Sequence, residues 1–271
     1  MRVSPDGTRA VFDSRDEAND LWVWDFARAI LSRLTFDQAP DLFPVWTPDG
    51  RWIVYRSVQA GPHNLFRRRA DGTGSPEQLT QATQIHSATD ATRDAVIFTD
   101  QVDTHDILMV PLEATGGERR VTPLVRTSAN ERNGTVSPNG RWLAYESDQS
   151  GANQVFVRPF PDTSSGQWQI SPGRGAKPRW SRDGRELFYV ADDNALMSVP
   201  VTEGAVFQPG AARKLFAVAG IPVLVNGLFY DVMPDGRRFV LLKTVAQPAA
   251  SAPAAPHIIA VLEWTDSLRK R

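Results

Sequence analysis

The chain has 271 residues, of which 41% are hydrophobic and 23% are charged, and this composition supports a large packed interior and excludes disorder. Thirty Lys and Arg side chains against 31 Asp and Glu give a formal net charge of -1, so no overall field attracts nucleic acid or an anionic membrane. The lack of cysteine excludes disulfides, thiolate metal sites and a cysteine nucleophile, and no apolar run reaches the roughly 18 residues of a membrane span.

In chain order, a polar turn followed directly by an apolar run occurs six times. The copies are VSPDGTRAVF from Val3, WTPDGRWIVY from Trp46, ATRDAVIF from Ala91, VSPNGRWLAY from Val136, WSRDGRELFY from Trp180 and VMPDGRRFVL from Val232. In this phrase Pro presets a turn, Asp bonds nearby backbone groups and Gly takes the left-handed conformation, so each copy predicts a hairpin between two antiparallel strands. The third copy keeps only Thr92-Arg93-Asp94 of the turn, but its apolar strand survives.

Two further strands follow each hairpin at regular distances. The run after each turn is apolar on both faces, as in Trp52–Tyr55, which is typical of a sheet covered on both sides. The third strands are predicted at 21–24, 65–66, 107–110, 155–157, 196–199 and 258–262, and shorter fourth strands at 33–35, 78–80, 120–122, 169–171 and 214–216. Four short strands per unit, with a period of roughly 42 to 49 residues, predict the blade of a β-propeller.

We therefore predict an all-β fold, a six-bladed β-propeller of four-stranded antiparallel blades, as a single domain over 1–271. The predicted blades cover about 1–38, 39–83, 84–126, 127–173, 174–218 and 219–271. The first and last blades are expected to be incomplete, because the inner strand of the first has only Met1 to Val3 and the last unit ends after its third strand. The Ala- and Pro-rich stretch 246–256 predicts an excursion from the last blade. Since the chain begins inside a repeat and its first residues are no export signal, we expect a fragment of a longer protein.

Motifs for catalysis and metal binding are missing from the sequence. It has no G-x-S-x-G, no H-E-x-x-H, no His-Arg-Asp or Asp-Phe-Gly, and no Gly-rich phosphate loop, so hydrolase, metalloprotease and kinase activity are not expected. The four histidines, His63, His86, His105 and His257, are spread over three units, so we predict no metal and no cofactor. The turn carboxylates, the repeated tryptophans and the Arg67–Arg69 run are interpreted as structural or surface features.

Candidate ligand-binding residues lie in the segments just before each turn, where the inner strand approaches the central channel. These segments differ most between units that are otherwise regular, and a rigid scaffold that presents variable segments is the usual place for recognition. The predicted residues are Asp41, Phe43, His86, Glu131, Arg132, Asn133, Lys177, Arg179, Phe229 and Tyr230. The three aromatic residues are equally compatible with plugging the channel. Convergence of His86, Glu131 and Lys177 would indicate an active site instead.

The phrase W-S/T-P-D-G-R, with its apolar strand and a downstream Leu-Thr, resembles the propeller repeat of the TolB family. The whole chain is more similar to the C-terminal propeller of membrane-anchored bacterial Ser/Thr protein kinases of the eukaryotic type. Four features carry this similarity: the stretch Arg33–Ser57, the dipeptide Phe160-Pro161 with GQWQIS at 166–171, the segment Trp180–Tyr189, and the ending IIAVLEWTDSLRKR.

The kinase resemblance implies a non-catalytic ligand- or protein-binding module outside the cytoplasm, the sensor region of a receptor-like kinase whose kinase domain and transmembrane segment lie upstream. The expected partner is a protein or a small molecule at the propeller face, with no nucleic acid and no membrane insertion. Two alternatives remain open. One is a soluble periplasmic scaffold of TolB type, and the other is a propeller hydrolase or lyase with an active site at the channel mouth.

Overall fold

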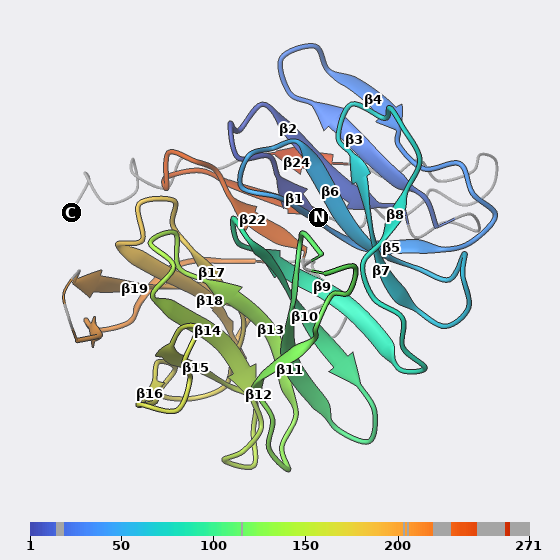
Figure 1. Cartoon of the computed structure of the whole chain (residues 1–271). Helices are drawn as coiled ribbons and strands as arrows, with labels where there is room; N and C mark the ends of the chain where they lie inside the picture. Colours follow the sequence, from blue (N-terminus) through green and yellow to red (C-terminus); the bar gives the residue numbers. More distant parts are fainter. Residues whose placement is uncertain are drawn as a thin grey trace, which may run out of the picture.

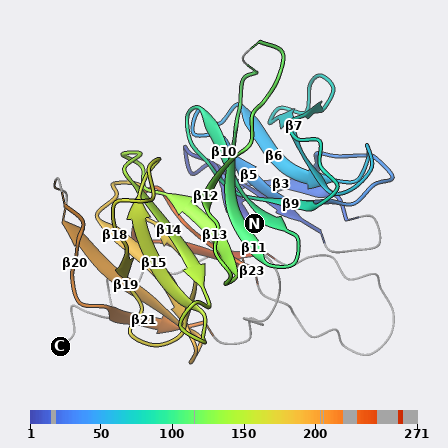
Figure 2. The ribbon, with the colours of Figure 1, turned by 60° about the horizontal axis from the view of Figure 1, so that its bottom comes forward.

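The computed structural model describes residues 1–14, 19–114, 116–202, 204, 206–218, 229–242 and 258–260, and in this part of the chain all regular secondary structure is strand. The strands form six antiparallel sheets arranged around a common centre (Figures 1 and 2). The predicted excursion 246–256, His257 and the basic residues 269–271 lie outside the described residues.

The first three sheets have four strands each. The first contains β1 (Arg2–Val3), β2 (Arg9–Asp13), β3 (Leu21–Asp25) and β4 (Ile30–Arg33). The second contains β5 (Asp41–Trp46), β6 (Trp52–Ser57), β7 (Asn64–Arg69) and β8 (Glu77–Gln78). The third contains β9 (Ile85–Ala91), β10 (Ala95–Gln101), β11 (His105–Pro111) and β12 (Thr122–Val125). In each, strands adjacent in sequence are adjacent in the sheet.

The last three sheets differ in strand number. The fourth contains β13 (Glu131–Val136), β14 (Trp142–Ser147), β15 (Gln154–Pro159) and β16 (Trp168–Gln169). The fifth contains β17 (Gly175–Trp180), β18 (Glu186–Ala191), β19 (Ala195–Thr202), β20 (Gln208–Pro209) and β21 (Arg213–Ala217), of which β20 and β21 pair with opposite halves of β19. The sixth contains β22 (Tyr230–Val232), β23 (Phe239–Leu242) and β24 (Ile258–Ala260).

The antiparallel propeller predicted from the repeat is therefore present, with a correction to its strand count. Six blades were predicted, with the first and the last incomplete. Five sheets, the first among them, have four or more strands, and the sixth has three within the described residues, so five complete blades are present. The first sheet has all four strands, although β1 spans only Arg2–Val3. Sequence reasoning missed β20, because Gln208–Pro209 carries no apolar pattern.

The repeated turns are stabilised by their own side chains. The first hydroxyl donates to the third residue's oxygen in four copies: Ser4 to Asp6 at 2.6 Å, Thr47 to Asp49 at 2.5 Å, Ser137 to Asn139 at 2.7 Å and Ser181 to Asp183 at 2.6 Å. The turn glycines have φ between 66° and 73°, a region that favours glycine. These bonds account for the recurring Asp without any ligand.

The polar residue after the fourth strand has an equally local function. Thr35, Thr80 and Ser171 are buried, and each hydroxyl accepts the backbone N–H at or near the start of the third strand of its own sheet, from Leu21, Leu65 and Val155 at 2.9 to 3.0 Å. Each hydroxyl thus satisfies a buried backbone donor. This explains the repeated Leu-Thr or Ile-Ser, which follows the short outer strand rather than forming part of it.

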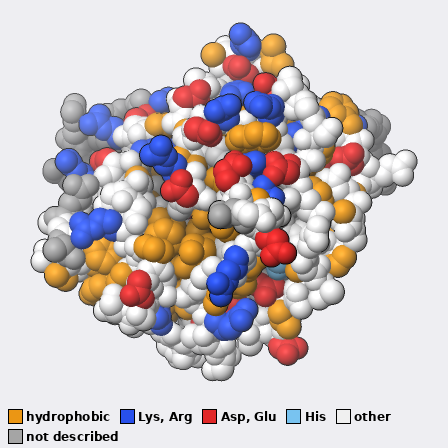
Figure 3. Space-filling view, in the orientation of Figure 1, with side chains coloured by type: hydrophobic (Ala, Val, Ile, Leu, Met, Phe, Trp, Pro, Cys, Tyr) orange, Lys and Arg blue, Asp and Glu red, His pale blue; other side chains and the backbone are white. Residues whose placement is uncertain are grey.

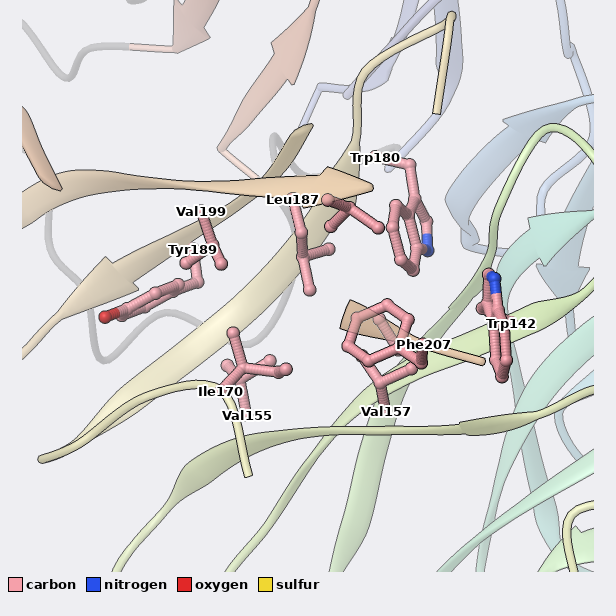
Figure 4. Packing of buried hydrophobic residues seen from close by; sticks show 11 residues of the cluster. Trp142, Val155, Val157, Ile170, Trp180, Leu187, Tyr189, Val199 and Phe207 are labelled. Carbon is pink, nitrogen blue, oxygen red and sulfur yellow. The ribbon is translucent and has the colours of Figure 1, made fainter. Parts of the chain in front are cut away.

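Most of the hydrophobic core lies between sheets rather than within them. Between the fourth and fifth sheets, Trp142, Val157, Trp180 and Leu187 pack with Phe207 (Figure 4). Trp142 and Trp180 each meet Phe207 edge-on, at ring centroid distances of 5.2 and 6.3 Å. The Trp180 indole N–H also donates to the carbonyl of Thr135 in the preceding sheet at 3.2 Å. The repeated tryptophan therefore joins neighbouring blades.

The Arg67–Arg69 run, interpreted from sequence as surface charge, is partly buried. Arg67 is 6% exposed, and its guanidinium bonds Glu77 at 2.7 Å and Glu113 at 2.8 Å, while Arg119 also bonds Glu77. Glu77 belongs to β8, and Glu113 and Arg119 lie in the loop after β11. The network links the second sheet to the third.

The sixth sheet is seated against the first. The inner strand β22 contacts both β17 and β1, and Val3 donates its backbone N–H to Asp231 at 2.7 Å. Met1, Val3 and Phe12 pack in one buried cluster with Met233 and Val240. The inner strands thus contact one another in succession from β1 to β22 and back to β1.

We predict that a methyl group added at Gly7 destabilises the contact between the first and sixth sheets. Gly7 has φ +73°, and a Cβ there would lie 2.9 Å from the Pro234 ring, whereas Gly140 has φ +69° and open space around it. Both Gly7→Ala and Gly140→Ala should lose about 1 kcal/mol of unfolding free energy from the left-handed backbone. Gly7→Ala should lose roughly 1 to 2 kcal/mol more through overpacking. Urea denaturation of the two variants measures the difference, and equal losses would contradict the contact between the first and sixth sheets.

Candidate functional site

The centre of the ring contains a cleft of about 480 Å³ at the end of the inner strands where the repeated turns lie. All six sheets contribute the same two positions to its wall, namely the first residue of each repeat phrase and the residue just before it. These pairs are Arg2-Val3, Val45-Trp46, Asp90-Ala91, Thr135-Val136, Arg179-Trp180 and Asp231-Val232. The rim is made by turn residues, among them Pro5, Pro48, Arg93, Pro138 and Arg182.

Seven charged residues line this cleft, and four of them lie on the inner strands: Arg2, Asp90, Arg179 and Asp231. Both carboxylates bond to backbone amides. Asp90 accepts the Val136 N–H at 2.8 Å, and Asp231 accepts the Val3 N–H at 2.7 Å, in each case from the next sheet. Arg2 donates to the carbonyl of Thr89. These three residues therefore hold neighbouring inner strands together as well as lining the cleft.

Arg179 differs from the other three charged residues. It is 3% exposed, and its Nε and Nη2 atoms are buried without a hydrogen-bond partner among the described residues. Burial lowers the pKa of Arg179, against the opposing charges of Asp231 and Asp90. The pKa of Arg2 is lowered to about 9 by burial and by the charge of Arg179. The cleft thus contains a buried guanidinium with unused hydrogen-bonding capacity.

Of the ten residues predicted from sequence, only Arg179 lines the cleft. The others lie mainly at the opposite, N-terminal ends of the inner strands. Glu131, fully buried at the start of β13, accepts hydrogen bonds from Thr127 at 2.7 Å and Ser147 at 3.2 Å. Asp41 is fully buried at the corresponding position of β5, opposite Ser57. Both carboxyl groups lie between strands rather than at a channel mouth.

The three residues whose convergence would have indicated an active site do not converge. His86 bonds Thr80 through Nδ1 at 3.0 Å, and burial lowers its pKa, so the ring is neutral beside Asp100. Lys177 donates its backbone N–H to Glu146 at 2.9 Å, and its Nζ lies 4.6 Å from the centroid of Phe229. Within the described chain no hydrogen bond joins His86, Glu131 and Lys177. This arrangement offers no general acid and base pair.

Lys177 and two other predicted residues mark a β-bulge that recurs in the inner strands. Phe43, Asn133 and Lys177 have φ of 55°, 54° and 58°, and the register shifts around each of them. Their variability reflects this local kink. Next to Asn133, the Arg132 guanidinium approaches His105 at 3.1 Å.

The two remaining predicted residues pack the junction between the fifth and sixth sheets. The Tyr230 hydroxyl donates to the Lys177 carbonyl at 2.7 Å, and its ring lies 5.7 Å from that of Phe229. Both side chains are buried in the hydrophobic cluster between these two sheets, together with Phe188 and Phe239, and are not exposed for stacking on a ligand.

Two classes of feature are not found in the described residues. No group of three or more His, Cys, Asp or Glu side chains in these residues is arranged to hold a metal ion. Nor does this part of the chain hold a helix with the length and apolarity to cross a bilayer. The face drawn in Figure 3 mixes acidic and basic side chains rather than separating them, in keeping with the balanced composition.

Comparison with known proteins establishes the fold. TolB from Acinetobacter baumannii superimposes with a TM-score of 0.67 at 18% identity, over 89% of this chain and 59% of that one. A TolB structure from Agrobacterium tumefaciens gives 0.62 at 18% identity, over 79% of each chain. The chain has the TolB-like β-propeller fold. Oligogalacturonate lyase from Vibrio parahaemolyticus shares it at a TM-score of 0.58 and 14% identity, over 89% of this chain and 72% of the lyase, so the fold alone does not decide between binding and catalysis.

Sequence comparison adds little to this result. No protein-family profile matches the chain. An uncharacterized protein of Agrobacterium fabrum is 34% identical over 80 residues, which are 29% of this chain and 27% of that protein. The chain thus spans about a quarter of that relative's length and 59% of the Acinetobacter TolB.

We predict that Asp41 lowers the stability of the fold at neutral pH. Burial, with the nearby charges of Asp37 and Asp20, raises its pKa from 3.8 to about 6. As the pH rises, the Asp41 carboxyl loses its proton in the unfolded chain before it does so in the folded chain. Its contribution to the free energy of unfolding is therefore most favourable below about pH 4 and falls between about pH 4 and pH 6. Asp41→Asn should therefore be more stable than the wild type at pH 7.5, by on the order of 2 kcal/mol, and the gap should close toward pH 4.

Urea denaturation between pH 4 and pH 8 measures this effect. Asp103→Asn, in an exposed loop, is the matched control and should leave the pH dependence unchanged. A wild-type pH dependence in Asp41→Asn would show that Asp41 ionises normally in the folded chain.

Proposed function

We propose that this chain is a non-catalytic recognition module whose ligand, a protein segment or a small molecule, enters the axial cleft. The observation that carries the proposal is the position of the cleft, which all six sheets line at equivalent places with differing side chains. In such a site the side chains differ from one sheet to the next, while the backbone that presents them stays regular. Among the described residues, His86, Glu131 and Lys177 form no hydrogen bonds with one another.

We further propose that the three-stranded sheet β22 to β24 acts as the sixth blade and closes the ring. Its support is the contact of β22 with β1 and β17, and the bonds from Val3 to Asp231 and from Tyr230 to Lys177. A closed ring fixes the diameter of the cleft, because each inner strand is held on both sides. A ligand then meets a preformed site, which lowers the entropy that binding must overcome.

The cellular context we propose is the extracytoplasmic sensor region of a receptor-like Ser/Thr kinase. The similarity of the blade-four and C-terminal phrases to kinase propellers supports it. A soluble periplasmic scaffold of TolB type is the second candidate, favoured by the superposition on two TolB structures at TM-scores of 0.67 and 0.62. Both candidates place a binding propeller outside the cytoplasm, and they differ in whether a kinase domain and a membrane anchor belong to the same protein.

Photocrosslinking tests whether the cleft is the binding site. A photoreactive amino acid at Arg182, an exposed residue of the cleft rim, should form a discrete adduct in intact cells of the source organism. The same amino acid at Ser75, exposed in the loop between β7 and β8 and outside the cleft, should form none or different ones. Identical adducts from both positions would exclude the cleft as the specific site.

Thiol labelling tests the compartment. Because the chain has no cysteine, Ser75→Cys introduces a single exposed thiol. In cells made permeable only at the outer membrane, a maleimide that does not cross the inner membrane should label this variant fully. Lysed cells are the control for reactivity of the thiol. Labelling that requires lysis of the inner membrane would place the propeller in the cytoplasm and exclude both candidates.

A further inference from the structure

The wall of the axial cleft includes a buried arginine, Arg179, two of whose nitrogens have no hydrogen-bond partner. Arg179 lines the cleft near the end of β17, is 3% exposed, and has no hydrogen-bond partner for Nε and Nη2. These two nitrogens lie on the same edge of the planar guanidinium, and their N–H groups point in the same direction. That edge matches the two oxygens of a carboxylate, which accept two parallel hydrogen bonds from it.

A guanidinium in this state is energetically unfavourable unless something fills its bonding capacity. A buried charged donor without a partner costs more than a neutral one, and most buried polar groups in proteins are bonded. Asp90 bonds the Val136 amide and Asp231 bonds the Val3 amide, and neither acid bonds Nε or Nη2 of Arg179. Among the four charged cleft residues of the inner strands, Arg179 is therefore the one with buried, unpartnered polar atoms in the described structure.

The remaining walls of the cleft define which anion fits. The lining holds four cations, Arg2, Arg93, Arg179 and Arg182, and three anions, Asp90, Asp94 and Asp231, so it carries one net positive formal charge. One added negative charge pairs with Arg179, whereas a second would face the two fixed carboxylates at close range. Trp46, Trp180 and Val45 add apolar surface, and their position suits an apolar body attached to the anionic group.

We propose that the axial cleft is a carboxylate-binding site in which Arg179 holds the two oxygens of a monoanionic ligand. This inference rests on the proposed recognition function and names the chemistry that the cleft selects. Both nitrogens are buried, so this proposal requires the Arg179 side chain to turn this edge into the cleft when the carboxylate enters. The carboxylate belongs either to the C-terminus of a peptide or to a small organic acid, because both present the same planar group.

Calorimetric titration of the whole chain tests the proposal with four probes. They are N-acetyl-Ala-Ala-Phe with a free C-terminal carboxylate, the same peptide as its C-terminal amide, acetate and inorganic phosphate. We expect the peptide acid to bind at least tenfold more tightly than the amide, since a charge-assisted bidentate bond is lost in the amide. Acetate that binds as tightly as the peptide acid identifies the site as one for small acids, and weaker acetate identifies a peptide C-terminus.

Two variants connect the binding to Arg179. Arg179→Met replaces the unpaired cation with an apolar side chain and should weaken the peptide acid at least tenfold, with a melting temperature close to that of the wild type. Arg185→Met, an exposed Arg of the same blade outside the cleft, is the control and should bind as the wild type does. A large fall in the melting temperature of Arg179→Met would show that Arg179 is a structural residue instead.

Four results would overturn the carboxylate site: equal binding of acid and amide, tighter binding of phosphate than of acetate, full binding by Arg179→Met, or no binding of any probe at millimolar concentration. None of them would overturn the recognition function itself, because photocrosslinking at the rim detects an occupant of any chemistry. If no specific crosslink formed at Arg182 in cells but the isolated chain still bound the peptide acid, the proposed recognition function would fail and the carboxylate site would stand.

Discussion

No sheet in this chain can bury its own two apolar faces, and the whole architecture follows from that constraint. The second strand of each unit is buried on both sides, as Ile53, Val54 and Tyr55 of β6 are. Such a strand is stable only where a neighbouring sheet covers each face. The clusters formed around Trp142, Phe207 and Trp180, and around Met1 and Met233, lie between sheets for this reason. The packing between neighbouring sheets therefore provides most of the stability. It does not determine which residue types lie at the centre of the ring.

The polar bonds across these junctions follow the same logic. Asp90 and Asp231 each accept a backbone amide from the inner strand of the next sheet, and Glu146 accepts that of Lys177. Inner strands do not pair with each other in a ladder, so their amides would otherwise lack partners near the axis. A carboxylate from the adjacent blade replaces the missing ladder. The acids in the cleft are thus primarily structural, and the same argument identifies Arg179 as the residue that structure alone does not explain.

The sequence allowed much of the fold to be predicted and little of the site. The turn phrases and apolar runs located the hairpins, because their residue types are required by local backbone geometry. The candidate residues Asp41, Phe43, Glu131 and Lys177 were chosen for their variability, but a recurrent bulge and buried contacts between strands explain it. The signal that would have found the cleft was present in the repeat itself. The position just before each phrase reads Arg2, Val45, Asp90, Thr135, Arg179 and Asp231, a set that local structure cannot dictate.

That position also has an evolutionary consequence. Each of the six residues lies on a different sheet, so a single substitution changes one position in the wall of the axial cleft while the other five stay the same. The turn on one side and the bulge on the other fix the backbone around it, so such a change need not disturb packing, although Asp90 and Asp231 are tied to adjacent strands. If the proposed recognition function holds, specificity can diverge by single substitutions at this position, one sheet at a time, without a new fold.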